Sequence, residues 1–223
     1  AQADGYTLLF HTCTFAISPA LQKKLPYRVP EDFPPIALAA YSPVVLVASR
    51  GLTANSVKEL IALAKDAPDT LNYGSVGTGS VAYVAAEMFK RAAGVRLTEV
   101  IYQGTSPALN SLLSGETHVM FSVFGAALAH IRANRLKALA MASAARSKLL
   151  PGLPTVAEAG VPGFDAMCWQ SVLGPRGIQP AIVKLLNTHI VEALGAPAMR
   201  AQFDALGFEP APSSPAEFAA YLQ

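Results

Sequence analysis

Short runs of consecutive apolar residues alternate along this chain with longer segments in which apolar residues recur every three or four positions. Continuous apolar runs are typical of strands buried on both faces, and the periodic segments are typical of helices with one buried side. Their alternation predicts an α/β fold with mostly parallel sheets and flanking helices. The predicted strands are Tyr6–Thr12, Ile36–Ala40, Val44–Ser49, Leu71–Tyr73, Leu97–Tyr102, Val119–Ser122, Leu136–Ala142, Cys168–Leu173 and Phe208–Pro210.

Several of the predicted helices carry start and stop signals. Ser56–Glu59 and Ser214–Glu217 match the capping box, in which a serine and a glutamate three residues later satisfy the first backbone N–H groups. Other helices are predicted from Val81 to Ala93, from Ser106 to a stop at Gly115, and over the amphipathic segment Pro180–Leu194.

The segment Ser147–Phe164 interrupts this rhythm because it is rich in proline and glycine. Leu149, Leu153, Val156 and Phe164 are spaced so that they can anchor it. The sequence therefore predicts a packed connecting segment here rather than a flexible linker.

Two predicted strands run directly into polar loops that open helices. The first loop, Gly74–Ser80, precedes the run from Val81, and the second, Tyr102–Pro107, follows the strand that starts at Leu97. A helix start has unpaired N–H groups and roughly half a positive charge, and glycine lets a ligand approach closely. Such loops gather at the carboxyl ends of the strands of an α/β sheet. The pair therefore predicts an anion-binding cleft for a carboxylate or a phosphate.

The candidate ligand contacts are backbone N–H groups and hydroxyls of these loops, with one further residue at the end of a third strand. They are Ser75, Gly77, Thr78, Gly79, Ser80, Tyr102, Gly104, Thr105 and Ser122. Each also has a structural explanation, because glycine turns and small polar residues at strand ends are ordinary turn chemistry.

A dinucleotide-dependent oxidoreductase is the alternative hypothesis, with Gly74–Ser80 as its phosphate loop and Glu99 as its ribose contact. The spacing G-x-x-G-x-G differs from the dinucleotide pattern G-x-G-x-x-G, and Glu99 falls inside a strand rather than at its end. No nucleophile has an evident activating base, and the four histidines are isolated. We therefore expect a binding protein without enzyme activity, metal or cofactor.

Charge, cysteine content and hydropathy exclude other classes. The net charge is +2 and Lys and Arg are scattered, which argues against nucleic-acid binding. Cys13 and Cys168 are either buried thiols or a single bridge. The mean hydropathy is high at +0.35, but apolar stretches such as Ile36–Ser49 fall short of the ~20 residues that a membrane helix needs, and Pro43 breaks this one.

Seven segments resemble the extracytoplasmic solute receptors of tripartite tricarboxylate transporters, also called the Bordetella uptake gene family. They keep their order and span nearly the whole chain, and Pro154–Gly160 is the most specific part. The segments are Asp4–Leu9 (DGYTLL), Leu71–Ser80 (LNYGSVGTGS), Tyr102–Leu109 (YQGTSPAL), Gly115–Phe121 (GETHVMF), Leu136–Ala142 (LKALAMA), Leu153–Phe164 (LPTVAEAGVPGF) and Trp169–Pro175 (WQSVLGP).

The resemblance implies a periplasmic receptor that delivers a small organic acid to the membrane subunits of such a transporter. A sensing receptor with the same cleft is the alternative within this class. The implied fold is the two-lobed type II fold of periplasmic binding proteins. The implied lobes are residues 1–48 with 170–223 and residues 49–169, joined by hinge strands at Val44–Ser49 and Met167–Val172.

The chain also departs from the family pattern. Family chains have a further strand–loop–helix unit before Asp4, so by this resemblance the chain is N-terminally truncated. Ser122 and Val123 replace a frequent Asp-Asn pair, which disfavours an amino-acid ligand. Tyr83 and Gln103 replace a frequent histidine and lysine. These changes keep the backbone donors and leave the particular acid open.

Overall fold

The computed structural model describes residues 1–21 and 24–222. The chain forms two compact units. Unit 1 consists of Ala1–Ser42 and Cys168–Gln223, and unit 2 consists of Pro43–Met167. Strands β2 (Pro35–Ser49) and β7 (Met167–Leu173) contain residues of both units.

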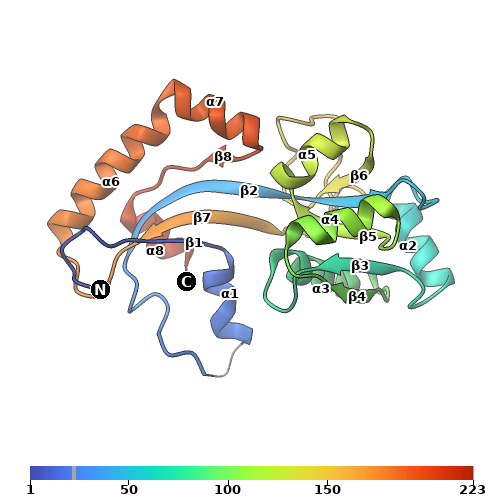
Figure 1. Cartoon of the computed structure of the whole chain (residues 1–223), viewed down its shortest axis with the longest axis horizontal. Helices are drawn as coiled ribbons and strands as arrows, with labels where there is room; N and C mark the ends of the chain where they lie inside the picture. Colours follow the sequence, from blue (N-terminus) through green and yellow to red (C-terminus); the bar gives the residue numbers. More distant parts are fainter. Residues whose placement is uncertain (22–23, 223) are drawn as a thin grey trace. The chain divides into compact units, whose positions relative to one another are not determined.

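Unit 1 holds a sheet in the order β1-β7-β2-β8. Strand β1 pairs antiparallel with β7, with Leu9 opposite Leu173, and β8 pairs antiparallel with β2, with Ala40 opposite Pro210. The other elements of the unit are β1 (Leu9–Thr12), α1 (Thr14–Leu21), α6 (Pro180–Gly195), α7 (Pro197–Leu206), β8 (Glu209–Pro210) and α8 (Pro215–Tyr221) (Figure 1).

A disulfide between Cys13 and Cys168 joins the residue before α1 to strand β7. Both cysteines are buried, so the bridge belongs to the core of unit 1. This finding resolves the open choice between free thiols and a bridge. Trp169 beside it is buried as well, and its ring lies 5.6 Å from the ring of Phe218.

The first strand is shorter and more exposed than the sequence predicts. It begins at Leu9 rather than Tyr6, because the N–H of Tyr6 is bonded to the Asp4 carboxylate at 3.0 Å and does not join a ladder. Phe10 is 62% exposed and lines an apolar groove of about 480 Å³ together with Val172. The interpretation of this strand as buried is therefore wrong.

Unit 2 holds a mixed sheet in the order β6-β2-β5-β3-β4. Strand β3 is parallel to β4 and β5, whereas β2 is antiparallel to β5 and β6. The α/β class is confirmed, and within this sheet the parallel pairs are β3 with β4 and β3 with β5. The elements are β3 (Asn72–Ser75), β4 (Thr98–Ile101), β5 (Val119–Val123), β6 (Leu136–Met141), α2 (Val57–Asp66), α3 (Val81–Ala93), α4 (Thr105–Ser114) and α5 (Phe124–Arg132) (Figure 1).

Two predicted strands, Ile36–Ala40 and Val44–Ser49, are one strand of 15 residues in the structure, β2. Pro43 does not break it, because the pairing of β2 with β8 uses Ala40 and Tyr41 and the pairing with β5 starts at Val44. Proline has no N–H to give to a ladder, and it is tolerated where the strand's partners change.

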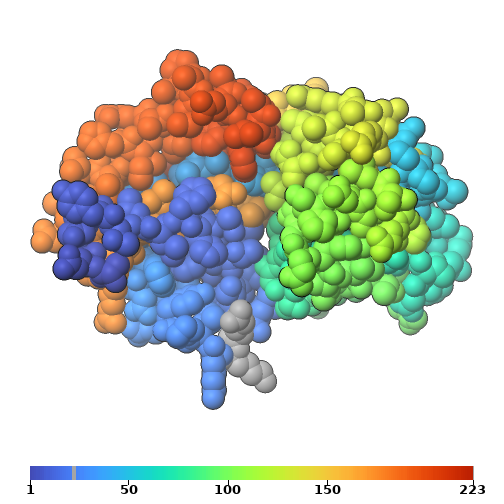
Figure 2. Space-filling view, viewed as in Figure 1, coloured from blue at the N-terminus to red at the C-terminus, as the bar shows by residue number. Residues whose placement is uncertain are grey.

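Strand β5 is buried on both faces, as its continuous apolar sequence predicts. Met120 belongs to the core cluster that it shares with residues of α4 and α5, among them Leu112 and Phe124. The next residue, Phe121, points to the opposite face. It lies 5.7 Å from the ring of Phe89 in α3. Figure 2 shows α4 and α5, in green and yellow-green, on the surface of this unit.

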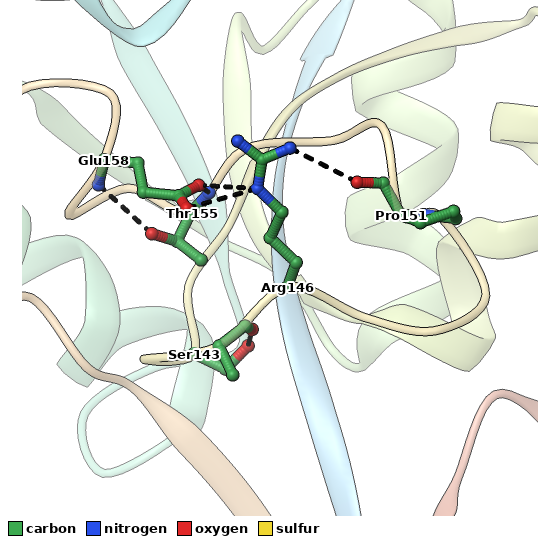
Figure 3. A network of polar contacts seen from close by, with 6 residues as sticks. Ser143, Arg146, Pro151, Thr155 and Glu158 are labelled. Carbon is green, nitrogen blue, oxygen red and sulfur yellow. Dashed lines mark hydrogen bonds and ion pairs between the residues drawn. The ribbon is translucent and has the colours of Figure 1, made fainter.

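The connecting segment after β6 is tightly held, which confirms the prediction of a packed connection. The Glu158 carboxylate accepts the N–H of Thr155 at 2.8 Å, and the Thr155 hydroxyl accepts the N–H of Glu158 at 3.1 Å. Arg146 donates to the same carboxylate at 2.8 Å and also to the carbonyl of Pro151 (Figure 3). The backbone hydrogen bond from Thr155, followed by that from Arg146, lowers the pKa of Glu158.

This network explains the most specific string of the family resemblance, Pro154–Gly160, in structural terms. The carbonyl of Pro154 accepts the N–H of Met141 at 2.8 Å, and the N–H of Val156 donates to the Met141 carbonyl at 2.8 Å. Val156 and Phe164 are buried. The string therefore fastens the segment to the end of β6.

Candidate anion-binding site

The site is built where three parallel strands of unit 2 end. Ser75, the last residue of β3, lies opposite Ile101, the last residue of β4, and the carbonyl of Ser75 accepts the N–H of Tyr102 at 2.9 Å. Strand β5 runs parallel to β3 and leads directly into α5 at Phe124. Because the carboxyl ends of parallel strands meet at one edge of a sheet, the starts of α3, α4 and α5 gather there.

The first loop takes a conformation that depends on its glycines. Gly77 and Gly79 have φ angles of +93° and +90°, a region that other residues rarely adopt. Ser80 closes the loop as the N-cap of α3, because its hydroxyl accepts the N–H of Tyr83 at 3.2 Å and donates to the Gly77 carbonyl at 2.8 Å. The loop is thus a preformed helix start.

The free donors of this loop are backbone N–H groups. Those of Thr78, Gly79 and Val81 have no protein acceptor within residues 1–21 and 24–222. Thr78 is exposed and Gly79 is half-buried, so an anion can reach both. The partial positive charge of the α3 dipole acts at the same place.

Three predicted contacts of the first loop have protein partners instead. Ser75 is completely buried, and its hydroxyl donates to the Glu99 carboxylate and accepts the N–H of Gly77 at 2.9 Å. The N–H of Ser80 donates to the carbonyl of Gly77 at 3.1 Å. The geometry therefore assigns Ser75, Gly77 and Ser80 to holding the loop, and leaves Thr78 and Gly79 as its donors.

The second loop also leads into a helix start, and fewer hydrogen bonds hold it in place. Gly104, with φ of +120°, is the N-cap of α4, and no side chain caps this end. The N–H groups of Thr105 and Ser106 are also without a protein acceptor in the described part of the chain. The hydroxyl of Tyr102, predicted to face a ligand, is hydrogen-bonded to Ser111 on α4.

The third strand contributes a helix start rather than a free side chain. Ser122 is buried, and its hydroxyl donates to the carbonyl of Val123 at 3.1 Å. Helix α5 begins directly afterwards at Phe124, again without a side-chain cap. The sequence predicts that His130 lies on a helix, but not where this helix begins, because a capping residue is absent. The spacing of Phe124, Leu128 and Ile131 was the available signal.

A polar network fixes α3 against β3 beneath the loop. The hydroxyl of buried Tyr73 donates to Glu87 at 2.9 Å, and the Lys90 ammonium donates to the same carboxylate oxygen at 2.6 Å. Burial, followed by the hydrogen bond to Glu87, raises the pKa of Tyr73 far above its usual value. Partial burial opposes ionisation of Glu87, but hydrogen bonds from Lys90 and Tyr73 outweigh it and lower its pKa.

The arrangement is suited to holding an anion. The helix starts that carry its backbone donors follow strands that end at one sheet edge, and the described residues contain no cluster of three His, Cys, Asp or Glu side chains placed for a metal ion. Glu99 is the ribose contact of the dinucleotide hypothesis, but its carboxylate accepts a hydrogen bond from the Ser75 hydroxyl instead. None of the helices in residues 1–21 and 24–222 combines the length and hydrophobicity of a membrane span.

Comparison with known families identifies the class of protein. A model described as the tripartite tricarboxylate transporter family receptor matches residues 1–223. The chain belongs to this family, whose members are solute-binding receptors and not enzymes. The family resemblance and the two-lobed fold class predicted from the sequence are thereby confirmed.

Individual relatives agree with this assignment. BugT of Bordetella pertussis is 37% identical over 215 residues, which are 96% of this chain and 66% of BugT. MatC from Rhodopseudomonas palustris, solved with bound malate, is 32% identical with a TM-score of 0.89 over 100% of this chain and 77% of MatC. R. palustris Rpa4515, solved with adipate, has the same identity and TM-score, and 75% of it is covered. The chain spans about two thirds of the length of its first curated relatives, 66% of BugT and 64% of a Pseudomonas protein.

Proposed function

We propose that this chain is the ligand-binding part of a receptor for a small organic acid, a mono- or dicarboxylate. The observation that carries the proposal is the convergence of helix starts at one edge of the unit 2 sheet. There the N–H groups of Thr78, Gly79 and Thr105 lack protein acceptors within the described residues. In this proposal they hold one carboxylate of the ligand.

The energetics are adequate for micromolar binding. A micromolar Kd corresponds to about 8 kcal/mol, and hydrogen bonds to a charged group contribute roughly 1.5–3 kcal/mol each. Three such bonds and two helix dipoles reach this value before the entropy cost of association is subtracted. The malate and adipate in the two R. palustris structures support a carboxylate as the ligand class.

Strand β5 ends without an acidic side chain that could pair with an ammonium group of the ligand. Ser122 stands where family chains often have an acidic residue, and its hydroxyl is buried. We therefore infer that the ligand is an acid without an amino group. Tyr83 and Gln103, at the edges of the two loops, are the side chains that we expect to select among acids.

The receptor is proposed to work in the periplasm and to deliver its acid to the membrane subunits of a tripartite tricarboxylate transporter. The Cys13–Cys168 disulfide supports this location, because disulfides persist in oxidising compartments such as the periplasm and are rare in the cytosol. The predicted lobes, residues 1–48 with 170–223 and residues 49–169, belong to the same proposal.

A thermal-shift screen tests the ligand class. Ligand that binds only the folded protein stabilises it by RT ln(1 + [L]/Kd), or about 2.7 kcal/mol at 100 Kd. We expect at least one small mono- or dicarboxylate to raise the melting temperature in a concentration-dependent manner, and NAD to leave it unchanged. A clear shift with NAD and none across a broad acid panel would contradict the proposed function.

A further inference from the structure

Glu99 stands at one end of a continuous chain of hydrogen bonds that reaches the start of helix α3. The Ser75 hydroxyl donates to the Glu99 carboxylate, and the same hydroxyl oxygen accepts the N–H of Gly77 at 2.9 Å. The Gly77 carbonyl accepts from the N–H and the hydroxyl of Ser80, at 3.1 and 2.8 Å. Since Ser80 caps α3, the whole loop is tied to a carboxylate on the neighbouring strand β4.

The chemistry of the serine hydroxyl means that the Glu99 carboxylate sets the direction of this series of hydrogen bonds. A hydroxyl has one proton and two lone pairs and can rotate about its C–O bond. When the hydroxyl donates its hydrogen bond to the carboxylate, a lone pair is left to accept the N–H of Gly77, and linked hydrogen bonds strengthen one another. Ser75 is 0% exposed, so water does not replace the carboxylate as its acceptor.

The orientation of Gly77 decides where the free donors of the loop point. Its φ angle of +93° is one of several that glycine adopts readily, so a hydrogen bond to its N–H helps to select this conformation. Thr78 and Gly79 follow it directly, so a rotation at Gly77 moves their N–H groups away from a common target. Among the described residues, the Ser75 hydroxyl is the only side-chain group that accepts a hydrogen bond from the Gly77 N–H.

We propose that Glu99 is a positioning residue of the anion site, acting through Ser75 and Gly77. The inference rests on the proposed function of this loop. Glu99 does not touch the ligand, and its negative charge lies one hydroxyl away from the loop that receives an anion. Like charges repel, so attraction does not explain a carboxylate at this place, whereas its role as the acceptor for Ser75 does.

Two substitutions separate the acceptor from the charge. Glu99→Gln keeps an oxygen that accepts the Ser75 proton and removes the negative charge, so we expect the Kd for a carboxylate such as malate or adipate to stay within about threefold of wild type. Glu99→Ala removes the acceptor, and we expect about tenfold weaker binding. Glu116→Gln is the matched control, because it removes a charge from an exposed position of the same unit.

A double-mutant cycle tests whether Glu99 acts through Ser75. We expect Ser75→Ala to weaken calorimetric binding about as much as Glu99→Ala, and the double variant to bind no more weakly than Ser75→Ala alone. Losses that add in the double variant would show that Glu99 acts by another route and would overturn the inference. Wild-type affinity in Glu99→Ala would also overturn it.

Amide hydrogen exchange at Gly77 gives a measurement that needs no ligand. We expect the Gly77 N–H to be protected in wild type and Glu99→Gln, and to exchange at least about tenfold faster in Glu99→Ala, because local opening governs exchange. Equal exchange in all three proteins would overturn the inference. If the wild type binds no acid, the proposed function fails, while this exchange experiment still decides the role of Glu99.

Discussion

Replacing Gly79 by valine is expected to weaken the binding of an organic acid by at least about 100-fold, or about 2.7 kcal/mol. The N–H of Gly79 is one of the free donors at the start of α3, and its φ angle of +90° suits glycine. A branched side chain strains this backbone by about 1–3 kcal/mol and blocks the approach of a carboxylate to the neighbouring N–H groups. Isothermal titration calorimetry measures the loss.

Gly115→Val is the matched control for this experiment. Gly115 ends α4 with a φ angle of +83°, and a Cβ atom added there meets nothing within 4 Å. This variant therefore carries similar backbone strain away from the site, and we expect it to bind like wild type. Unchanged affinity in a folded Gly79→Val protein would remove the first loop from the site.

Loss of the disulfide is expected to lower the free energy of unfolding of unit 1 by about 2–5 kcal/mol. Cys13 and Cys168 are 155 residues apart, so the bridge closes a long loop and restricts the unfolded chain strongly. It also joins the two separate chain segments that make up unit 1. Denaturant titrations of wild type and the Cys13→Ser/Cys168→Ser double variant measure the difference.

A reductant provides the control for this prediction. Dithiothreitol should lower the stability of the wild type toward that of the double variant and should have no effect on the double variant itself. Equal stability of the oxidised wild type and the double variant would show that the bridge does not stabilise unit 1. The proposed ligand contacts lie in unit 2, whereas the bridge lies in unit 1. Ligand binding by the double variant therefore also tests whether the two units unfold separately.

The α/β fold followed from the sequence wherever local patterns agree with tertiary pairing. The runs at Leu71, Val119 and Leu136 became strands, and the capping boxes at Ser56 and Ser214 became helix starts. Strand direction could not be predicted, because pairing depends on contacts distant in sequence. For the same reason Pro43 was assigned to a break, although it lies inside β2 at a change of partner strands.

The candidate site was predictable at the level of loops but not of atoms. The glycine pattern correctly located a preformed helix start, since Gly77 and Gly79 both have positive φ angles. Which groups remain free depends on hydrogen bonds across strands. Ser75 is hydrogen-bonded to the Glu99 carboxylate, and Tyr102 is hydrogen-bonded to the Ser111 hydroxyl. Both partners come from other elements, and no local pattern indicates either contact.

In the proposed site, free backbone N–H groups at the helix starts of unit 2 bind an organic acid. The most direct measurement is an amide NMR titration of the wild-type protein with small carboxylates, including malate and adipate. We expect saturable shifts of the Thr78, Gly79 and Thr105 amides with one common Kd, and little change at Gly94 and Gly115, where the helices α3 and α4 end. Saturable binding that leaves the Thr78, Gly79 and Thr105 amides unchanged would contradict it.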